Sequence, residues 1–172
     1  MKRNIIVCGL IAGLILTAMM IGSTAYCYKN ENFEGNMVFG YTVMILAFSL
    51  IFVGIKNFRD KYNQGLISFG KAFKIGAYIT LVASTMYVIV WLFEYYLFIP
   101  DFMDVYAAYV INQAKSAGST VAEISAKTEE MATYKEMYKN PLFVILLTYT
   151  EVLPIGLIVS AISALILKKQ FV

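Results

Sequence analysis

Four long apolar stretches dominate the chain, and segments rich in charged residues separate them. The stretches cover residues 5–28, 37–55, 75–99 and 141–167. A helix needs about 20 mostly apolar residues to cross a hydrocarbon core of about 30 Å. Because backbone amides cannot stay unpaired in lipid, all four stretches are predicted to be transmembrane helices. Asn140 followed by Pro141 supports this for the last stretch, since a capping residue before proline is typical of a helix start.

The polar segment 100–140 has a helical pattern of its own. Five apolar residues recur at the spacing of one helix face: Phe102, Val105, Tyr106, Tyr109 and Val110. Gly118 is predicted to end this helix, and Thr120 with Glu123 has the spacing of a capping box that begins a second one. We therefore expect an amphipathic helical hairpin. Its apolar stripes either cover the transmembrane helices and the membrane surface or form a cap that binds a partner or ligand.

Basic residues are distributed unevenly between the segments. The N-terminus, segment 56–74 and the C-terminus together hold nine Lys and Arg residues and one acid, Asp60. Segments 29–36 and 100–140 hold five lysines and eight acids. Because Lys and Arg concentrate on the cytoplasmic side of membranes, both termini are predicted to be cytoplasmic and the helical hairpin extracytoplasmic.

The composition agrees with a membrane protein. Apolar residues make up 60% of the 172 residues and charged residues 15%, against roughly 45–50% and about 25% in soluble domains. These values exclude a disordered chain and a disulfide-rich secreted module. The predicted fold is an all-α integral membrane protein, a single domain of residues 1–172 with four transmembrane helices and an extracytoplasmic amphipathic helical hairpin between spans 3 and 4.

The first 25 residues also have features of a signal peptide. Lys2 and Arg3 precede an apolar run, and Ser-Thr-Ala at 23–25 has the form of a cleavage site. The apolar run is longer than the 7–15 residues typical of a signal peptide. An uncleaved first transmembrane helix is therefore favoured over a segment that is removed.

Segment 56–74 interleaves five cations with four aromatic residues: Phe58, Tyr62, Phe69 and Phe73. Nucleic-acid sites combine the same residue types, but aromatic and basic residues also anchor helix ends at the headgroup layer of a membrane. A net charge of +3 is small for a nucleic-acid binder. We expect anchoring at the lipid bilayer, with contact to anionic lipid and no nucleic-acid partner. The sequence indicates no particular protein partner.

Small residues form two faces at which helices can approach closely. One consists of Gly9 and Gly13, and the other of Gly156, Ser160 and Ala164. These faces are expected to pack within the chain, and a homo-oligomer that uses them is the alternative.

Recognised catalytic motifs are absent from the sequence. The chain has no histidine, no phosphate-binding loop, no Gly-x-Ser-x-Gly and no Cys-x-x-Cys. We therefore predict no enzyme activity, no catalytic residue, no cofactor and no metal site.

Two acids inside predicted spans, Glu94 and Glu151, form with Pro154 the candidate polar site, either a proton or cation site or a structural hydrogen-bonding group. Neither Glu94 nor Glu151 has a basic partner in any span, and intramembrane acids normally face the interior of a protein. On a straight helix Glu151 would lie about 15 Å beyond Pro141, while Pro154 is expected to kink the helix beside it. Glu94 lies nearer a helix end and can reach the headgroups. The two carboxyls are expected to differ little in depth and could face each other and share a proton.

Four sequences point to a known family: GIKNFRDK at 54–61, GLISFGKAF at 65–73, PDF at 100–102 and EVLPIGL at 151–157. With these sequences the chain resembles a Bacteroidetes domain-of-unknown-function family of small four-span membrane proteins. The resemblance covers essentially the whole chain and implies a multi-pass protein of the bacterial inner (cytoplasmic) membrane. It implies no activity and no functional residue.

Two functions are consistent with these observations. The first is a non-enzymatic structural or accessory component of the inner membrane. The alternative is a small transport-type protein that uses the buried carboxylate of Glu151, with or without Glu94, as a proton or cation site.

Overall fold

The computed structural model describes residues 2–30, 32–33 and 37–169. Its helices, in chain order, are α1 (Lys2–Asn30), α2 (Met37–Tyr62), α3 (Phe69–Phe93), the π-helix η1 (Glu94–Phe98), α4 (Phe102–Ser116), α5 (Val121–Tyr138) and α6 (Pro141–Leu167). Over these ranges no strand forms, and an isolated β-bridge joins Ile67 to Lys169. The prediction of an all-helical chain is confirmed.

Within the described residues, four helices are long and apolar enough to cross a membrane: α1, α2, α6, and α3 together with η1. Each contains nearly all of one predicted apolar stretch. The helices α2 and α3 also extend into segment 56–74, so that only residues 63–68 connect them. Helical backbone hydrogen bonds continue past the last apolar residue, whereas the predicted spans ended at the first charges.

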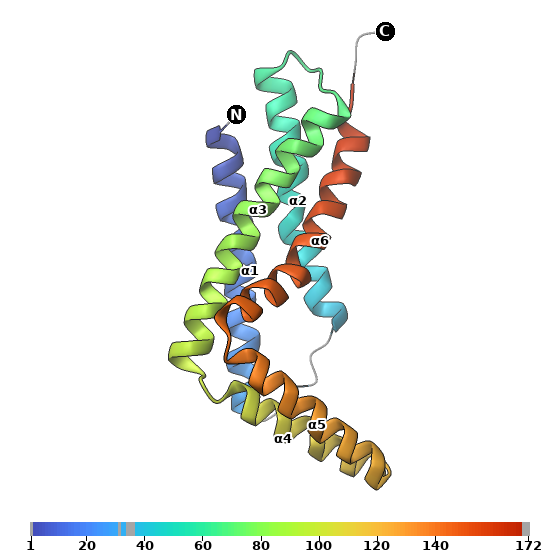
Figure 1. Cartoon of the computed structure of the whole chain (residues 1–172). Helices are drawn as coiled ribbons and strands as arrows, with labels where there is room; N and C mark the ends of the chain where they lie inside the picture. The colour runs from blue at the N-terminus through green and yellow to red at the C-terminus, as the bar shows by residue number, and fades with distance from the viewer. Residues whose placement is uncertain (1, 31, 34–36, 170–172) are drawn as a thin grey trace.

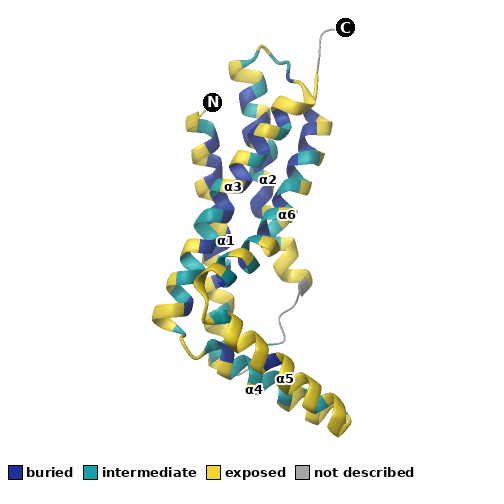
Figure 2. Ribbon diagram, in the orientation of Figure 1, coloured by how far each residue is buried: buried dark blue, intermediate teal, exposed yellow. Residues whose placement is uncertain are grey.

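The four long helices lie side by side, and α3 contacts α1, α2 and α6. Both described ends of the chain lie at one end of this assembly, and the hairpin of α4 and α5 lies across the other end (Figure 1). Large apolar side chains on the outward faces of the long helices are exposed (Figure 2), as expected of surfaces that face lipid.

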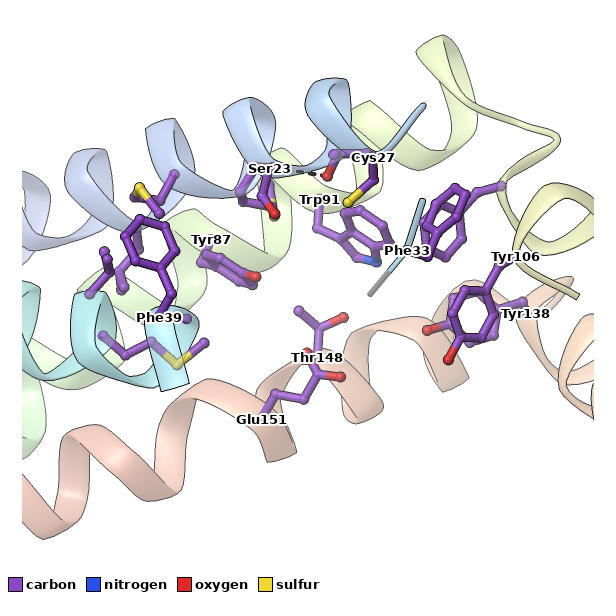
Figure 3. A pocket seen from close by; sticks show the side chains of 18 residues that line it. Ser23, Cys27, Phe33, Phe39, Tyr87, Trp91, Tyr106, Tyr138, Thr148 and Glu151 are labelled. Atoms are coloured by element: carbon purple, nitrogen blue, oxygen red, sulfur yellow. Dashed lines mark hydrogen bonds between the residues drawn. The ribbon is translucent and has the colours of Figure 1, made fainter. Parts of the chain in front are cut away.

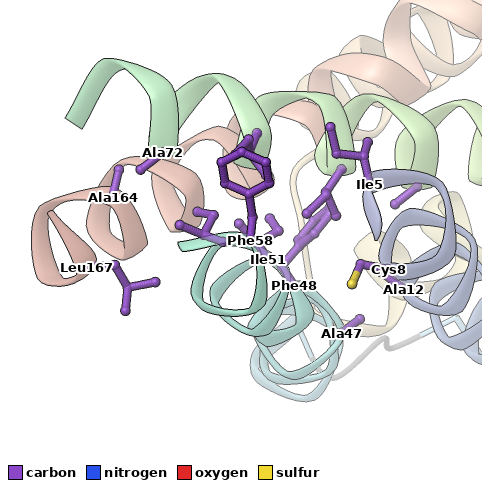
Figure 4. Packing of buried hydrophobic residues seen from close by; sticks show 14 of the residues in the cluster. Ile5, Cys8, Ala12, Ala47, Phe48, Ile51, Phe58, Ala72, Ala164 and Leu167 are labelled. Carbon is purple, nitrogen blue, oxygen red and sulfur yellow. The ribbon is translucent and has the colours of Figure 1, made fainter. Parts of the chain in front are cut away.

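The interior near the chain termini is tightly packed. Phe48, Ile51 and Ile55 of α2 are fully buried there, and the core reaches Phe58 and Leu167 (Figure 4). We call this part the closed half. It excludes water and lipid because apolar side chains from all four long helices meet in it.

Small residues bring the helices close together in this core. A Cβ added at Gly9 would lie 2.7 Å from Val82 of α3, and one added at Gly76 would lie 2.8 Å from Ser160 of α6. The Ser160 hydroxyl is also 3.2 Å from the Thr80 hydroxyl. Both predicted small-residue faces therefore pack within the chain, and self-association remains a prediction.

The other end of the assembly is open. No residue of α2 between Val38 and Leu46 is buried, whereas Ala47 and Phe48 are fully buried (Figure 2). The helix α6 changes direction part-way along its length (Figure 1), and Pro154 lies inside it. Proline explains the bend, because it removes a backbone donor and clashes with the preceding turn. We call this end, together with the hairpin that lies across it, the open half.

Local signals in the sequence end and begin the hairpin helices as predicted. Gly118 follows α4 with a φ of +75°, a conformation that favours glycine. Thr120 and Glu123 form the capping box of α5. The Asn140 side chain accepts a hydrogen bond from the Leu142 N–H at the start of α6. These turns set the lengths of the helices that cover the open half.

The basic segment is more structured than predicted. Phe58 is buried in the core and the Lys71 ammonium lies 5.1 Å from its ring centroid, so this aromatic residue does not anchor the chain in headgroups. Arg59 donates a hydrogen bond to the Leu167 carbonyl at the end of α6. Contact of the remaining cations with anionic lipid stays a prediction.

Candidate functional site

A pocket of about 440 Å³ lies in the open half, between α1, α2, α3 and α6 and beneath the α4–α5 hairpin (Figure 3). Six of its aromatic side chains come from four separate parts of the chain: Phe33, Tyr87, Trp91, Phe102, Tyr106 and Tyr138. Aliphatic and sulfur-containing side chains form its deeper wall. The volume is typical of a site for a small organic ligand.

Aromatic contacts fix the hairpin over the pocket. The ring of Phe102 stacks on Tyr106 at 6.0 Å and meets the edge of Trp91 at 5.4 Å between centroids. Phe33 contacts Phe102 and Tyr106 at 6.0 and 5.9 Å. Each aromatic pair contributes about 0.5–1.5 kcal/mol beyond its buried area. Because Phe33 of the α1–α2 connection, Trp91 of α3 and two hairpin residues share this cluster, the hairpin is attached to the spanning helices.

Hydrogen bonds add to this attachment. The Tyr96 hydroxyl donates to the Tyr138 carbonyl at 3.2 Å, and the Tyr28 hydroxyl reaches the Asp101 carboxylate at 3.5 Å. Within the hairpin, Lys135 of α5 pairs with Asp104 of α4. The two hairpin helices are therefore attached to each other and to the spanning helices.

Two faces of the pocket oppose each other. Tyr87 and Trp91 lie one turn apart on α3, and Thr148 and Glu151 lie on α6 across the space (Figure 3). The Thr148 hydroxyl donates to the Val144 carbonyl of its own helix. The polar group left to interact with a ligand from α6 is therefore the carboxyl of Glu151.

Glu151 was predicted to be buried, but its side chain is exposed within this open pocket, because the bend in α6 and the exposed start of α2 leave the space beside it open. In the described part of the chain it forms no hydrogen bond or ion pair, and no lysine or arginine lines the pocket. Burial and then the negative charge of Glu151 raise the pKa of Tyr138 to about 12. Both effects disfavour the phenolate, so the Tyr138 hydroxyl stays protonated at neutral pH.

The straight helix assumed for Glu151 in the sequence analysis is not what the structure shows. The first part of α6 runs across the assembly before the bend, so that Glu151 shares a pocket with Tyr138 and Phe102 of the hairpin. Pro154 is itself exposed and contributes the bend, with no place in the pocket lining.

Glu94 lies elsewhere. It lines a separate groove of about 390 Å³ between α1 and α3, beside Thr24 and Phe98. Its Oε2 atom is buried without a hydrogen-bond partner among the described residues. Glu94 also begins η1, where the Ile99 N–H donates to the Glu94 carbonyl at 3.0 Å. The structure thus does not bring the two carboxyls together as a proton-sharing pair, although Tyr87 lies within electrostatic range of both.

Sequence reasoning identified Glu151 but missed its neighbours. Tyr87 and Trp91 are four apart and Thr148 and Glu151 three apart, so each pair shares a helix face. Those spacings were visible in the sequence. The meeting of the two faces was not, because it depends on the bend in α6 and on the position of α2.

The pocket offers binding groups more than reactive ones. Among the described residues, no three His, Cys, Asp or Glu side chains come together in a group that could hold a metal ion. Cys27 lines the pocket as a free thiol. A single carboxylate, hydroxyl groups, one thiol and aromatic rings are the chemistry that the described lining offers a ligand.

A protein-family model described as "Protein of unknown function (DUF4199)" matches residues 8–169. The matched range contains the pocket, both candidate carboxyls and the hairpin. No curated protein and no solved structure matches the chain.

Proposed function

Because the chain belongs to the DUF4199 family, to which no activity is assigned, we propose a function from the pocket: a non-enzymatic accessory protein of the bacterial inner membrane that holds a small ligand beneath the α4–α5 hairpin. The observation that carries this proposal is the pocket of about 440 Å³ with one unpartnered carboxylate, Glu151. Because Glu151 is exposed within the pocket and has no partner among the described residues, its carboxylate is available to bind a ligand.

A binding role is favoured over catalysis. Thr148 of the pocket donates its hydroxyl hydrogen to the Val144 carbonyl of its own helix and is not paired with a base. The tyrosines of the pocket lie among aromatic rings and have no activating cation in its lining. A nucleophile with a general base within hydrogen-bond reach, the usual requirement for covalent catalysis, is missing from the described lining.

Transport of a proton or cation by Glu151 is the second candidate, supported by the same unpartnered carboxyl. Transport also needs a path to the opposite side of the membrane. Below the pocket, Phe48, Ile51 and Val152 are each fully buried in the core. A ligand held at Glu151 would therefore require a large rearrangement of the closed half to pass through, whereas binding requires none.

The proposal also includes the orientation of the protein in the membrane and the way in which it would self-associate. The basic excess around the termini supports a cytoplasmic closed half and an extracytoplasmic hairpin. The pocket would then open at the outer leaflet. Self-association would have to use lipid-facing side chains, since Gly9 and Gly156 already contact helices of the same chain.

Trp91 provides a direct test, because it is the single tryptophan of the chain and lines the pocket. The full-length protein in phosphatidylcholine nanodiscs is titrated with octanol, octyltrimethylammonium and octyl sulfate while tryptophan emission is recorded. We expect a saturable change with at least one probe. Ser23→Leu should remove it, because Ser23 is exposed within the pocket and leucine would occupy part of the space.

The matched control is Gly22→Leu. Gly22 is the preceding residue, does not line the pocket and has no atom within 4 Å of an added Cβ. This variant should bind the probe as the unmodified protein does. A linear response to every probe, or an equal loss of binding in both variants, would contradict a ligand site here.

A further inference from the structure

The charge inside the pocket is of one sign. Glu151 is the only acidic or basic side chain among the described residues that line it. A neutral ligand would leave this carboxylate uncompensated, and an anionic ligand would be repelled by it. A cationic group is the complement that neutralises it.

The aromatic faces around Glu151 favour the same sign of charge. Tyr87, Trp91, Tyr106 and Tyr138 all line the pocket, and the faces of such rings attract cations, tryptophan most strongly. Tyr138 keeps its proton at neutral pH, so its ring adds no second negative charge. A carboxylate beside several aromatic rings is the chemistry that recognises an ammonium group.

The shape of the pocket indicates an amphiphile. Its deeper wall is formed by apolar side chains such as Leu16, Met20 and Met44. On the α2 side the wall is not closed, because Phe39 and Gly40 are both lining and exposed. A molecule with an apolar body could therefore enter sideways between α2 and α6 without crossing the closed half.

Phospholipid headgroups fit the pocket less well. The amine of a zwitterionic phospholipid is accompanied by a phosphate, and no lysine or arginine among the described lining residues would neutralise it. The phosphate would instead lie near the Glu151 carboxylate.

We propose that the ligand is an amphiphilic organic cation without a phosphate, whose ammonium group binds Glu151 and whose apolar body lies among the aromatic and methionine side chains of the pocket. This inference rests on the proposed ligand-binding function and specifies the class of ligand.

The test extends the Trp91 titration to headgroup preference, with octyltrimethylammonium, octanol, octyl sulfate and octylphosphocholine as probes of one chain length. We expect the cation to bind roughly tenfold tighter than octanol, which corresponds to about 1.4 kcal/mol. The sulfate should bind most weakly, and octylphosphocholine should bind more weakly than the cation.

Substitutions assign the preference to one carboxyl. Glu151→Gln should bind octanol as before and lose the preference for the cation, and Glu151→Asp should retain part of it. Glu94→Gln is the matched control, because Glu94 lines the other groove, and it should keep the full preference. Gel filtration and helical circular dichroism verify that each variant is folded.

The two proposals fail in different ways. If octanol binds as tightly as octyltrimethylammonium, or if Glu94→Gln removes the preference as Glu151→Gln does, the cation assignment is overturned while the pocket remains a binding site. Equal affinity for octylphosphocholine would overturn the exclusion of phospholipid headgroups. If no probe gives a saturable response, the ligand-binding function itself is overturned.

Discussion

The same four long helices pack closely in the closed half of this protein and stay apart in the open half. In the closed half, glycines allow helices to touch, and Phe48 and Ile51 are fully buried. In the open half, no residue of α2 between Val38 and Leu46 is buried, and the hairpin ring of Phe102 contacts Phe33 of the α1–α2 connection. Small residues permit close contact along a helix pair, whereas aromatic rings bridge separated helices and leave space between them. The pocket follows from this difference.

The largest expected effect concerns which side of the membrane each half faces. In a background without Cys8 and Cys27, cysteines are placed singly at Ser119, in the α4–α5 turn, and at Asn63, between α2 and α3. A membrane-impermeant thiol reagent applied to intact spheroplasts should label the first variant almost completely and leave the second unlabelled. Labelling of Asn63→Cys with protection of Ser119→Cys would reverse the proposed orientation. Permeabilised cells, in which both should react, are the control.

The same substitution in the two halves should have opposite effects on stability. A Cβ at Gly156 would overlap the Thr80 side chain and lie 3.0 Å from Phe48, so Gly156→Ala should destabilise the protein by about 1–3 kcal/mol. Gly40 has no atom within 4 Å of an added Cβ. Gly40→Ala should therefore stabilise α2 by about 0.5–1 kcal/mol through the lower cost of ordering alanine. Unfolding in nanodiscs, followed by circular dichroism, measures both changes. Similar losses in both variants would contradict an open half.

The aromatic contacts that hold the α4–α5 hairpin over the pocket can be weakened without changing the closed half. Phe102 contacts Phe33, Trp91 and Tyr106, so Phe102→Leu should cost about 1 kcal/mol. Amide hydrogen exchange should rise in α4 and α5 while exchange in the closed half is unchanged. Phe98→Leu is the matched control, because Phe98 is 78% exposed and should leave the hairpin protected. Faster exchange throughout the chain would show that the halves do not behave independently.

The smallest expected effect is a pH dependence at the start of α5. Hydrogen bonds from Thr120 lower the pKa of Glu123. Because the pKa is lower in the folded state, the capping box stabilises the helix above the unfolded-state value of about 4.3 and is lost as the pH falls through the folded-state pKa. Exchange in the first turn of α5, corrected for intrinsic rates, should accelerate at acid pH. Glu123→Gln keeps an acceptor that does not titrate, so its corrected exchange should not change with pH.

Local signals explain how much of this fold could be predicted. Runs of apolar residues located the four long helices. Gly118 and Thr120 located the turn between the two shorter helices, and Asn140 located the start of α6, because each acts on a few neighbouring residues. The bend at Pro154 was also predicted. Its direction was not, since the side to which a kinked helix turns depends on the helices packed against it. Without that direction, the sequence could not show that Glu151 would share a pocket with residues of the hairpin.

The candidate site was predictable only in part, for a related reason. An acid inside an apolar stretch is conspicuous, so Glu151 and Glu94 were both identified. Aromatic residues are common at membrane interfaces, and nothing in the sequence distinguishes Tyr87 or Tyr138 of the pocket from an anchoring residue. The proposed pairing of the carboxyls assumed straight neighbouring helices. The structure instead places them in separate cavities, since α6 bends and α3 continues into a π-helix at Glu94.

Because of the π-helix η1, the orientation of the hairpin depends on the number of residues between α3 and α4. A π-helical turn holds more residues than an α-helical turn, so Glu94–Phe98 carries the equivalent of one inserted residue. Deleting a residue there would let α3 continue as a regular α-helix and would rotate everything that follows by about 100°. The rings of Phe102 and Tyr106 would then turn away from the pocket, even though no residue that lines it had been replaced.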